Sequence, residues 1–194
     1  MAQAAAGDVM TRRGWFFATY FAVLGVGASM VVHPAPRLIW NETASVPVGL
    51  YRLHPVPAPH VGDLVAVRLP EREAMLLARR GYLPSGVPLL KPVAAVAGQS
   101  VCRTGQRITI DGQFAGDAQS VDHRGRPLPF WQGCHRLDSG QIFVMNTAEP
   151  RSLDGRYFGP LPVSTVIGRA TPVWLPSGSN QPAIVTTNPS PKGQ

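Results

Sequence analysis

The sequence predicts a mostly β protein with an N-terminal transmembrane helix and one short soluble helix. Its 194 residues include 20 Gly and 20 Pro but only 15% charged residues, a composition typical of short strands joined by many turns. The uncharged run over residues 14–32 is long enough to cross a bilayer, and residues 71–80 carry the other helical pattern. A chain of this length holds one domain with a real core, plus an anchor or a tail.

Residues 14–33 are expected to form a transmembrane signal-anchor. Arg12 and Arg13 precede the uncharged run, which as a helix would be about 28 Å long, close to the roughly 30 Å hydrocarbon core of a bilayer. Because positive residues favour the cytoplasmic side, residues 1–13 are expected in the cytoplasm. Residues 37–175 then form a domain outside the cytoplasm.

The competing interpretation of this segment is a cleaved signal peptide, since Gly27, Ala28 and Ser29 are small enough for cleavage. The apolar run exceeds the roughly 7–15 residues usual for the core of such peptides, which favours a retained anchor. Whether residues 1–29 are retained stays open. At the other end, residues 176–194 are rich in Ser, Asn, Pro, Thr and Gly, and we expect a disordered tail.

The basic balance of the chain does not indicate a nucleic-acid-binding protein. The formal net charge is +7, but the Arg residues occur as scattered singles and pairs, without a basic helix face or interleaved aromatic residues. We therefore expect no direct contact with nucleic acid and, at most, weak attraction to anionic lipid head groups.

Cys102 and Cys134 are the two cysteines of the chain. They lie in no CxxC motif and no metal-ligand spacing, so the sequence indicates neither a metal site nor a bound cofactor. In an oxidising compartment they are expected to form a disulfide, worth roughly 3–4 kcal/mol by the chain-entropy estimate. Two free buried thiols are the alternative.

Turn residues divide the rest of the domain into short elements. Pro47 restricts its own backbone and that of Val46, so Ser45 to Gly49 read as a tight extended turn that leaves Ser45 on a loop. The helix over Glu71 to Arg80 is expected to end at Gly81. Strands are expected over residues 51–53, 64–69, 88–96, 106–110, 141–145 and 164–174, with a hairpin turn at 111–112 and a long excursion over 115–135.

Lys91 stands out within this pattern. It lies in Pro88-Leu-Leu-Lys-Pro-Val-Ala-Ala-Val96, among aliphatic and proline residues, and it is one of two Lys among 18 basic residues. Burial lowers the pKa of an amine, and a pKa near 7 would require about 4 kcal/mol of differential stabilisation. Arg cannot be deprotonated in a protein, so Lys at this position suggests a removable proton. The alternative is a snorkelling Lys whose head reaches water.

Ser45 is the candidate nucleophile, because its loop position leaves the hydroxyl accessible. A Ser needs a base within hydrogen-bond reach. No His is convincingly placed for that role, and neither GxSxG nor HExxH occurs. Lys91 is the remaining candidate base, and a Ser-Lys pair is a known variant of nucleophilic catalysis.

Four segments, in order, resemble the motifs of the type I signal peptidase family (S26), and in particular its conjugative-transfer, TraF-type branch. They are Ser45-Val-Pro-Val-Gly-Leu-Tyr51, Gly62-Asp-Leu-Val65, Arg80-Gly-Tyr-Leu-Pro-Ser-Gly-Val-Pro-Leu-Leu-Lys-Pro-Val93 and Ser152-Leu-Asp-Gly-Arg-Tyr-Phe-Gly159. The resemblance covers about residues 40–175 plus the anchor. It implies a signal-peptidase-like β fold and a membrane-anchored endopeptidase without a metal or cofactor.

The resemblance also implies roles for individual residues. Ser45 would attack the scissile carbonyl and Lys91 would take its proton. The backbone N–H of Ser45 would form part of the oxyanion hole. Thr43 occupies the position of the family's second oxyanion donor, although the family residue there is not identical.

Three further residues match the family's Ser-x-Asp-x-Arg motif. Ser152 corresponds to the serine that orients the lysine, and Asp154 and Arg156 complete the motif. Asp154 supports catalysis on this reading. Its structural alternatives are a salt bridge with Arg156 or a turn role before Gly155.

Three functions remain in consideration. The first is a peptidase of the bacterial inner membrane, with a periplasmic catalytic domain, that processes a conjugative pilin precursor. Some members of the conjugative branch also join the ends of the pilin into a ring. Type IV secretion components would be further partners of such a peptidase. The second is a general signal peptidase acting on many exported proteins. The third is a non-catalytic periplasmic scaffold of a secretion system. The sequence does not distinguish hydrolysis from cyclisation.

Overall fold

The computed structural model describes residues 11–31 and 37–176. The chain divides into two units, residues 1–35 and 36–194, and each is considered by itself. Residues 177–194, where we expect a disordered tail, and residues 1–10 of the expected cytoplasmic segment lie outside the described residues.

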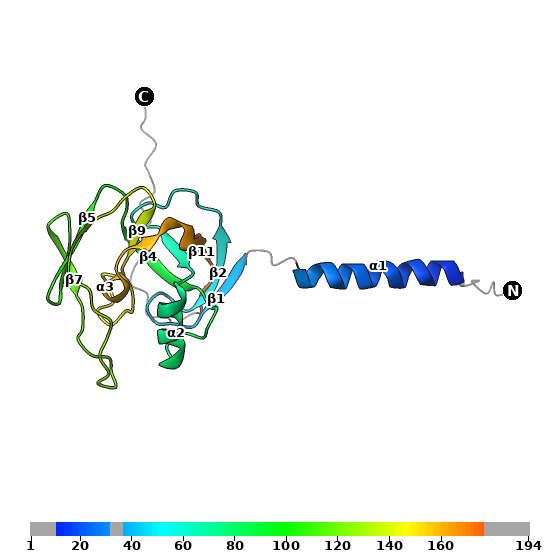
Figure 1. Ribbon diagram of the computed structural model, residues 1–194, viewed down its shortest axis with the longest axis horizontal. Coiled ribbons are helices and arrows are strands. Elements are labelled where there is room, and N and C mark those ends of the chain that lie inside the picture. The colour runs from blue at the N-terminus through cyan, green and yellow to red at the C-terminus, as the bar shows by residue number, and fades with distance from the viewer. Residues whose placement is uncertain (1–10, 32–36, 177–194) are drawn as a thin grey trace, which may run out of the picture. The chain divides into compact units, whose positions relative to one another are not determined.

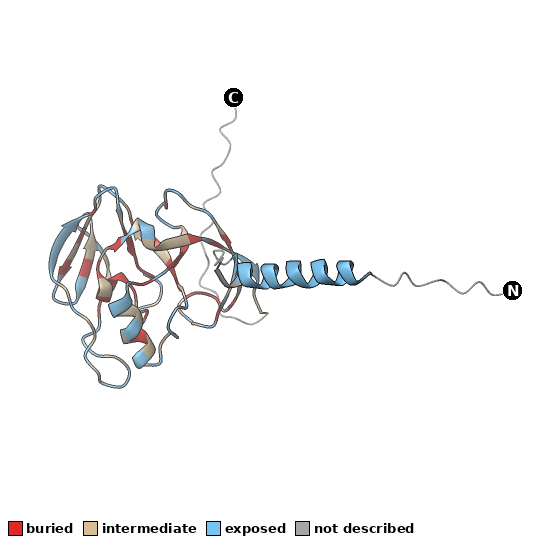
Figure 2. Cartoon of the chain, turned by 45° about the vertical axis from the view of Figure 1, so that its right-hand side comes forward, coloured by how far each residue is buried: buried red, intermediate tan, exposed pale blue. Residues whose placement is uncertain are grey.

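Helix α1, Arg12–Val31, contains most of the segment expected to be a signal-anchor. Nearly all of its described side chains are exposed, including Trp15, Tyr20 and Phe21 (Figure 2). Among the described residues, no helix reaches the combination of length and mean hydropathy required of a membrane span.

The second unit contains a seven-stranded sheet (Figure 1). Its strands run in the spatial order β1-β2-β11-β3-β4-β9-β10, and the pairs are antiparallel. Their bounds are β1 Leu38–Asn41, β2 Gly49–His54, β3 Leu64–Val67, β4 Leu89–Ala95, β9 Gln141–Val144, β10 Leu161–Pro162 and β11 Val166–Trp174. Helix α2, Glu71–Arg79, connects β3 to β4 and buries Leu77 in the core.

A four-stranded sheet in the order β7-β6-β5-β8 forms the other layer. Its strands are β5 Ser100–Thr104, β6 Arg107–Ile110, β7 Gln113–Asp117 and β8 Gly133–Arg136. Asp111 and Gly112 both have positive φ at the β6–β7 turn, which confirms the predicted Asp-Gly hairpin. The predicted disulfide is also confirmed, since Cys102 and Cys134 join β5 to β8.

The two sheets pack through a shared apolar cluster. Ala95 and Phe143 of the large sheet meet Val101 and Ile108 of the small one, all fully buried. Figure 2 shows the buried residues gathered along the strands of this unit. The mostly β fold agrees with the sequence prediction, and β4, which carries Lys91, lies inside the large sheet between β3 and β9.

Strands β1, β5, β8 and β10 and two short helices were not predicted, and β10, with two residues, is too short for a pattern. Strands β1, β5 and β8 lack the alternating apolar pattern, and β8 is exposed along its whole length. They are strands because the neighbouring strands satisfy their backbone groups, which the sequence does not reveal. Helix α3, Gly155–Phe158, and the 3₁₀ turn η1, Val163–Thr165, are too short for a periodic signal.

Candidate active site

Ser45 lies in the turn between β1 and β2, and side chains beneath the turn fix its shape. The buried Asn41 amide donates to the carbonyls of Thr43, Val46 and Pro47, at 2.9, 3.0 and 3.1 Å. The Tyr51 hydroxyl, fully buried, also donates to Pro47 O at 2.6 Å. The inward carbonyls are therefore satisfied by side-chain donors of the protein itself.

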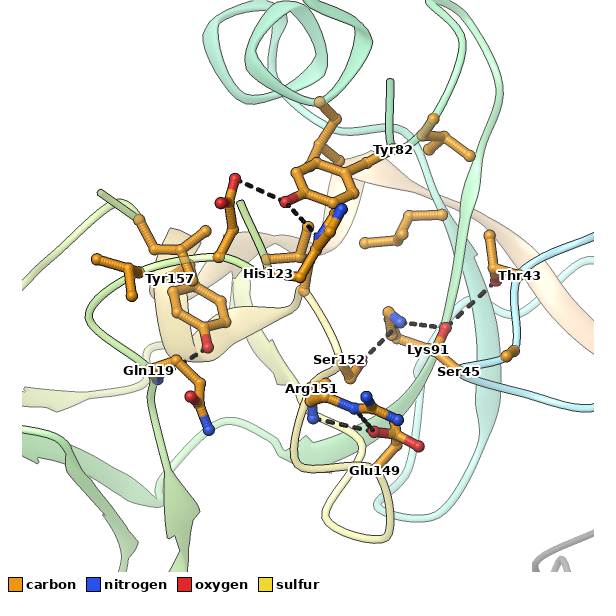
Figure 3. A pocket seen from close by; sticks show the side chains of 18 residues that line it. Thr43, Ser45, Tyr82, Lys91, Gln119, His123, Glu149, Arg151, Ser152 and Tyr157 are labelled. Carbon is orange, nitrogen blue, oxygen red and sulfur yellow. Dashed lines mark hydrogen bonds and ion pairs between the residues drawn. The ribbon is translucent and has the colours of Figure 1, made fainter. Parts of the chain in front are cut away.

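Lys91 points from the middle of the large sheet toward this turn. Lys91 lies opposite Val65 on β3, and its side chain is only 2% exposed. Its Nζ donates to Ser45 Oγ at 2.5 Å and to Ser152 Oγ at 2.7 Å (Figure 3). The head of Lys91 therefore does not reach bulk solvent as a snorkelling Lys would, and the structure brings the candidate base and nucleophile into direct contact.

The environment of Lys91 favours the neutral amine. Burial lowers the pKa of Lys91 from 10.5 to about 8, against the opposing effect of the negative charge on Asp154. At pH 7 roughly a tenth of the amine is then unprotonated, compared with less than a thousandth for an ordinary Lys. This places the group within the range in which a general base works near neutral pH.

Asp154 and Arg156 form a buried ion pair beneath the loop that carries Ser152. Their side chains are 0% and 1% exposed, and Arg156 Nη2 and Nε donate to the two Asp154 oxygens at 2.9 Å each. The Asp154 carboxylate also accepts from the backbone N–H of Asn146 and of Arg156. In the described part of the chain, no hydrogen bond joins Asp154 to Lys91 or Ser45. Asp154 therefore acts on Lys91 through the electric field of its negative charge.

Arg156 holds the 146–150 segment in place. Its guanidinium donates to the carbonyls of Asn146, Glu149 and Pro150 at 3.0, 2.7 and 2.9 Å. Gly155 allows this motif to pack tightly, because a Cβ there would lie 2.6 Å from the Phe143 ring and 2.7 Å from Val144 O. The Ser152 hydroxyl thus reaches Lys91 from a loop that is fixed from below.

Thr43 lies beside the nucleophile, with its Oγ1 3.3 Å from Ser45 Oγ. Its hydroxyl donates to Asn41 Oδ1 at 2.7 Å, and its backbone N–H donates to the same oxygen at 3.1 Å. In this arrangement Thr43 accepts from Ser45, and donation to an oxyanion would require its hydroxyl to rotate away from Asn41. Its expected role as an oxyanion donor stays a prediction.

Two asparagines at the site were missed by the sequence reasoning. Asn41 organises the Ser45 turn, and the amide of Asn146 donates to Ser45 O from the opposite side. Each acts on backbone carbonyls whose directions are set only by the fold. The one available signal was an amide side chain, Asn41, at the end of an apolar segment and four residues before the candidate nucleophile.

Replacing Asn41 by Leu should destabilise the fold and disorder the Ser45 turn. The change keeps the side-chain size but leaves the carbonyls of Thr43 and Val46 without this donor, at about 1–3 kcal/mol for each buried group that water cannot reach, while Pro47 O keeps the Tyr51 hydroxyl. We expect a loss of about 2–4 kcal/mol, measured by denaturant unfolding. Gln113→Leu, at an exposed position on β7, is the control. Equal stability of the two variants would contradict this role for Asn41.

A pocket of about 500 Å³ opens beside the Ser45–Lys91 pair (Figure 3). Ser45 and Thr43 lie on one side of it, with Gln119 and Tyr157 on the opposite side. Over residues 11–31 and 37–176, no group of three His, Cys, Asp or Glu side chains is placed to hold a metal ion. The site thus consists of a hydroxyl, a buried amine with a lowered pKa and an adjoining cavity, which is the equipment for acyl transfer.

Comparison with known proteins agrees with this chemistry. The family model described as signal peptidase, peptidase S26, matches residues 10–175. A probable conjugal transfer protein TraF from Sinorhizobium fredii is 39% identical over 144 residues, 69% of this chain and 74% of that protein. A plasmid transfer protein TraF from Escherichia coli is 30% identical over 168 residues, 80% of this chain and 94% of that protein.

A probable signal peptidase I-1 from Synechocystis sp. is 32% identical over 135 residues, 70% of this chain and 63% of that protein. The match to the family model extends from the start of α1 to the end of β11 and includes all the residues of the candidate site. The chain therefore belongs to the S26 signal peptidase family, on the branch that contains the TraF proteins.

Proposed function

We propose that this protein is a membrane-anchored serine endopeptidase that uses a Ser45–Lys91 dyad to process a pilin precursor for conjugative DNA transfer. The observation that carries the chemistry is the 2.5 Å contact between Lys91 Nζ and Ser45 Oγ at a buried position. The conjugative role rests on the TraF relatives, whose names connect them to conjugal and plasmid transfer.

In the proposed reaction the unprotonated Lys91 amine accepts the proton of Ser45, and Ser45 Oγ attacks the scissile carbonyl carbon. The negative charge on the carbonyl oxygen is stabilised by the Ser45 backbone N–H, where one donor is typically worth about 3–4 kcal/mol. Protonated Lys91 then returns the proton to the leaving amine, and an acyl-enzyme remains on Ser45. Water hydrolyses this ester, or an amine of the substrate attacks it and closes a ring.

Ser152 supports the dyad by accepting a hydrogen bond from Lys91, which orients the amine so that its lone pair can face the Ser45 hydroxyl. The buried Asp154–Arg156 pair keeps the Ser152 loop in place. Both contributions are positional, and they hold the base within reach of the nucleophile before substrate binds.

The proposed setting is the inner membrane of a bacterium. Helix α1 would be the anchor, with Arg12 and Arg13 facing the cytoplasm and inner-membrane lipid around the apolar side chains. Residues 37–175 would then be periplasmic, a compartment in which the Cys102–Cys134 disulfide persists. A substrate delivered through the membrane would reach the pocket there, near components of a type IV secretion apparatus.

A general signal peptidase that removes leader peptides from many exported proteins is the second candidate. The similarity to the Synechocystis protein, a probable signal peptidase I-1, favours it. The number of precursors that accumulate in cells lacking the protein distinguishes the two functions. One pilin-like precursor indicates the dedicated enzyme, and many unrelated precursors indicate the general one.

Replacing Ser45 by Ala should abolish processing of the pilin precursor while protein level and membrane location stay unchanged. In a serine-protease triad, loss of the nucleophile lowers kcat by about 10⁶-fold, and we expect a loss of similar order here. Mass spectrometry of the candidate pilin, made with and without this protein, gives the readout and the cleavage site. Ser164→Ala, at an exposed position in η1, is the matched control. Normal processing by Ser45→Ala would leave the non-catalytic scaffold as the explanation.

A further inference from the structure

Arg103 is a buried cation on β5 that lies outside the pocket. Its side chain is only 2% exposed, and in the part of the chain that the structure describes no carboxylate forms an ion pair with it. Burying a charge without a counter-charge costs free energy that an aliphatic residue at the same position would not cost. The reason for a guanidinium at this position therefore lies in the groups that it contacts.

Arg103 reaches from the small sheet to helix α3, which lies beside it (Figure 1). Its Nη1 donates to Arg156 O at 2.6 Å, its Nε donates to Gly105 O at 3.0 Å, and the Phe130 ring lies over the guanidinium at 4.4 Å. In a longer helix the Arg156 carbonyl would accept from the residue four positions on, which is Pro160 and has no N–H. Arg103 supplies the donor that the backbone cannot.

Trp131 makes a second contact of the same kind. It lies in the segment between β7 and β8, and its Nε1 donates to Gly155 O, the carbonyl that precedes Arg156 O, at 3.1 Å. Its ring packs edge-on against Phe143 of β9. Gly155 itself packs closely on β9, since a Cβ there would lie 2.6 Å from the Phe143 ring. We name Arg103 and Trp131 the α3 clamp, because they hold two consecutive carbonyls of the helix.

Helix α3 in turn determines where Ser152 lies. Arg156 fixes the carbonyls of Asn146, Glu149 and Pro150 from this helix, and Asp154 caps the helix by accepting from the Arg156 backbone N–H at 3.1 Å. Ser152 lies two residues before Asp154, and its Oγ is 2.7 Å from Lys91 Nζ. A shift of α3 would therefore move the Ser152 hydroxyl relative to the amine. A misplacement of about 1 Å at a reacting site can lower a rate about 10²-fold.

We propose that the two residues of the α3 clamp are positioning residues for the proposed reaction, because they hold α3 where the Ser152 hydroxyl can accept from the Lys91 amine. The proposal rests on the proposed endopeptidase function and deepens it by assigning to the site two residues that do not line the pocket. Since neither residue touches the space in which substrate would bind, their loss should slow cleavage and leave substrate binding unchanged.

Single-turnover cleavage of the pilin precursor measures the kinetic consequence. Arg103→Met keeps an unbranched apolar stem but removes the donors, so the maximal rate should fall about 10–100-fold while the half-saturating precursor concentration stays within about twofold. Arg103→Lys, which keeps the charge and one donor, should recover part of the rate. Arg107→Met is the matched control, since Arg107 is an exposed cation on β6 that lies 5.5 Å from the Phe114 ring. It should leave the rate unchanged.

The dependence on Ser152 distinguishes positioning from a general loss of stability. In a Ser152→Ala background the hydroxyl that α3 positions is absent, so Arg103→Met should lower the rate by less than about twofold more. Trp131→Phe keeps an aromatic ring but removes the Nε1 donor, and we expect the same dependence with a smaller effect. Reductions that multiply in the double variants would overturn the proposal, because they would show that the clamp does not act through Ser152.

An NMR signal from Lys91 tests the clamp without any substrate. The chain has two lysines, Lys91 and Lys192, so isotopically enriched lysine gives two Cε signals from the full-length protein, and the second is an internal reference. In Arg103→Met and Trp131→Phe the Lys91 signal should move toward its position in Ser152→Ala, and the control variant should leave it in place. An unmoved signal in folded Arg103→Met would overturn the proposal. If that variant does not fold, an unmoved signal in Trp131→Phe would do so.

The two measurements separate the clamp from the proposed function. If the Lys91 signal moves as expected while the wild type cleaves no precursor, the hold of the clamp on Ser152 stands and the endopeptidase fails. If the wild type cleaves the precursor but neither the rate nor the signal responds to Arg103→Met, the endopeptidase stands and the clamp fails. A moved signal with an unchanged rate would also overturn the positioning role.

Discussion

Replacing Lys91 by Arg should reduce precursor processing by at least about 10³-fold, although the positive charge is kept. A guanidinium has a pKa above about 12 and cannot accept the Ser45 proton. General-base catalysis alone contributes about 10²–10⁴-fold to the rate. When a nucleophile and a base act as a unit, removing one of them usually costs about as much rate as removing both. The measurement is the single-turnover rate of precursor cleavage. Activity within tenfold of the wild type would remove Lys91 from the role of base.

The same assignment gives the wild-type pH profile. Because the unprotonated amine is the active form and the pKa of Lys91 is about 8, the rate should rise about tenfold per pH unit below that value and level off above it. A carboxylate base would instead give a rate that is flat from pH 6 to 9.

Lys91→Met supplies the control for folding. A folded-state pKa lowered from 10.5 to about 8 means that protonated Lys91 costs stability at and below pH 8, and that this cost, about 3 kcal/mol, disappears as pH rises toward 10.5. The Met variant lacks the cost but leaves the hydroxyls of Ser45 and Ser152 without their donor. We expect an inactive protein that is about 1–2 kcal/mol more stable than the wild type at pH 7. Above about pH 10.5 the difference should reverse, because the cost is gone while the two hydroxyls still lack their donor.

The sequence identified the reacting groups more readily than their surroundings. Lys91 was visible because a lone amine in an aliphatic run is costly, and Ser45 because proline and glycine residues force a turn around it. Both arguments concern local chemistry. The strand position of Lys91 and the Asp111-Gly112 hairpin were predictable for the same reason.

The supporting contacts depend on distances across the fold and were not predictable. Asn146 reaches Ser45 across about a hundred residues of sequence, and Arg103 on β5 donates to the carbonyl of Arg156 on α3. Asp122, which accepts hydrogen bonds from Tyr82 and Arg126, lies in a segment that the sequence indicated only as a Gly- and Pro-rich excursion. Such contacts are selected by which elements pack together, and single-sequence periodicity does not contain that information.

The Asp154–Arg156 pair offers the clearest test of structural against catalytic roles. Because both side chains are almost completely buried, loss of one partner leaves an uncompensated charge. Asp154→Ala should lower the free energy of unfolding by about 3–5 kcal/mol in denaturant unfolding. Asp63→Asn is the control, since Asp63 pairs with the half-exposed Arg169 at 3.6 Å and should cost less than about 1 kcal/mol. Similar losses in the two variants would contradict a buried, mutually dependent pair.

The isosteric variant Asp154→Asn separates the two roles. The negative charge of Asp154 raises the pKa of Lys91, so its removal should shift the midpoint of the pH profile to lower pH. A carboxylate that only holds Arg156 in place, without an electrostatic effect on Lys91, would leave the midpoint where it is and change only stability and maximal rate. Adding Arg156→Met should recover part of the stability, because the double variant no longer buries a lone guanidinium. A lowered midpoint in Asp154→Asn would therefore show that this buried carboxylate sets the working pH of the base while it also holds the loop in place.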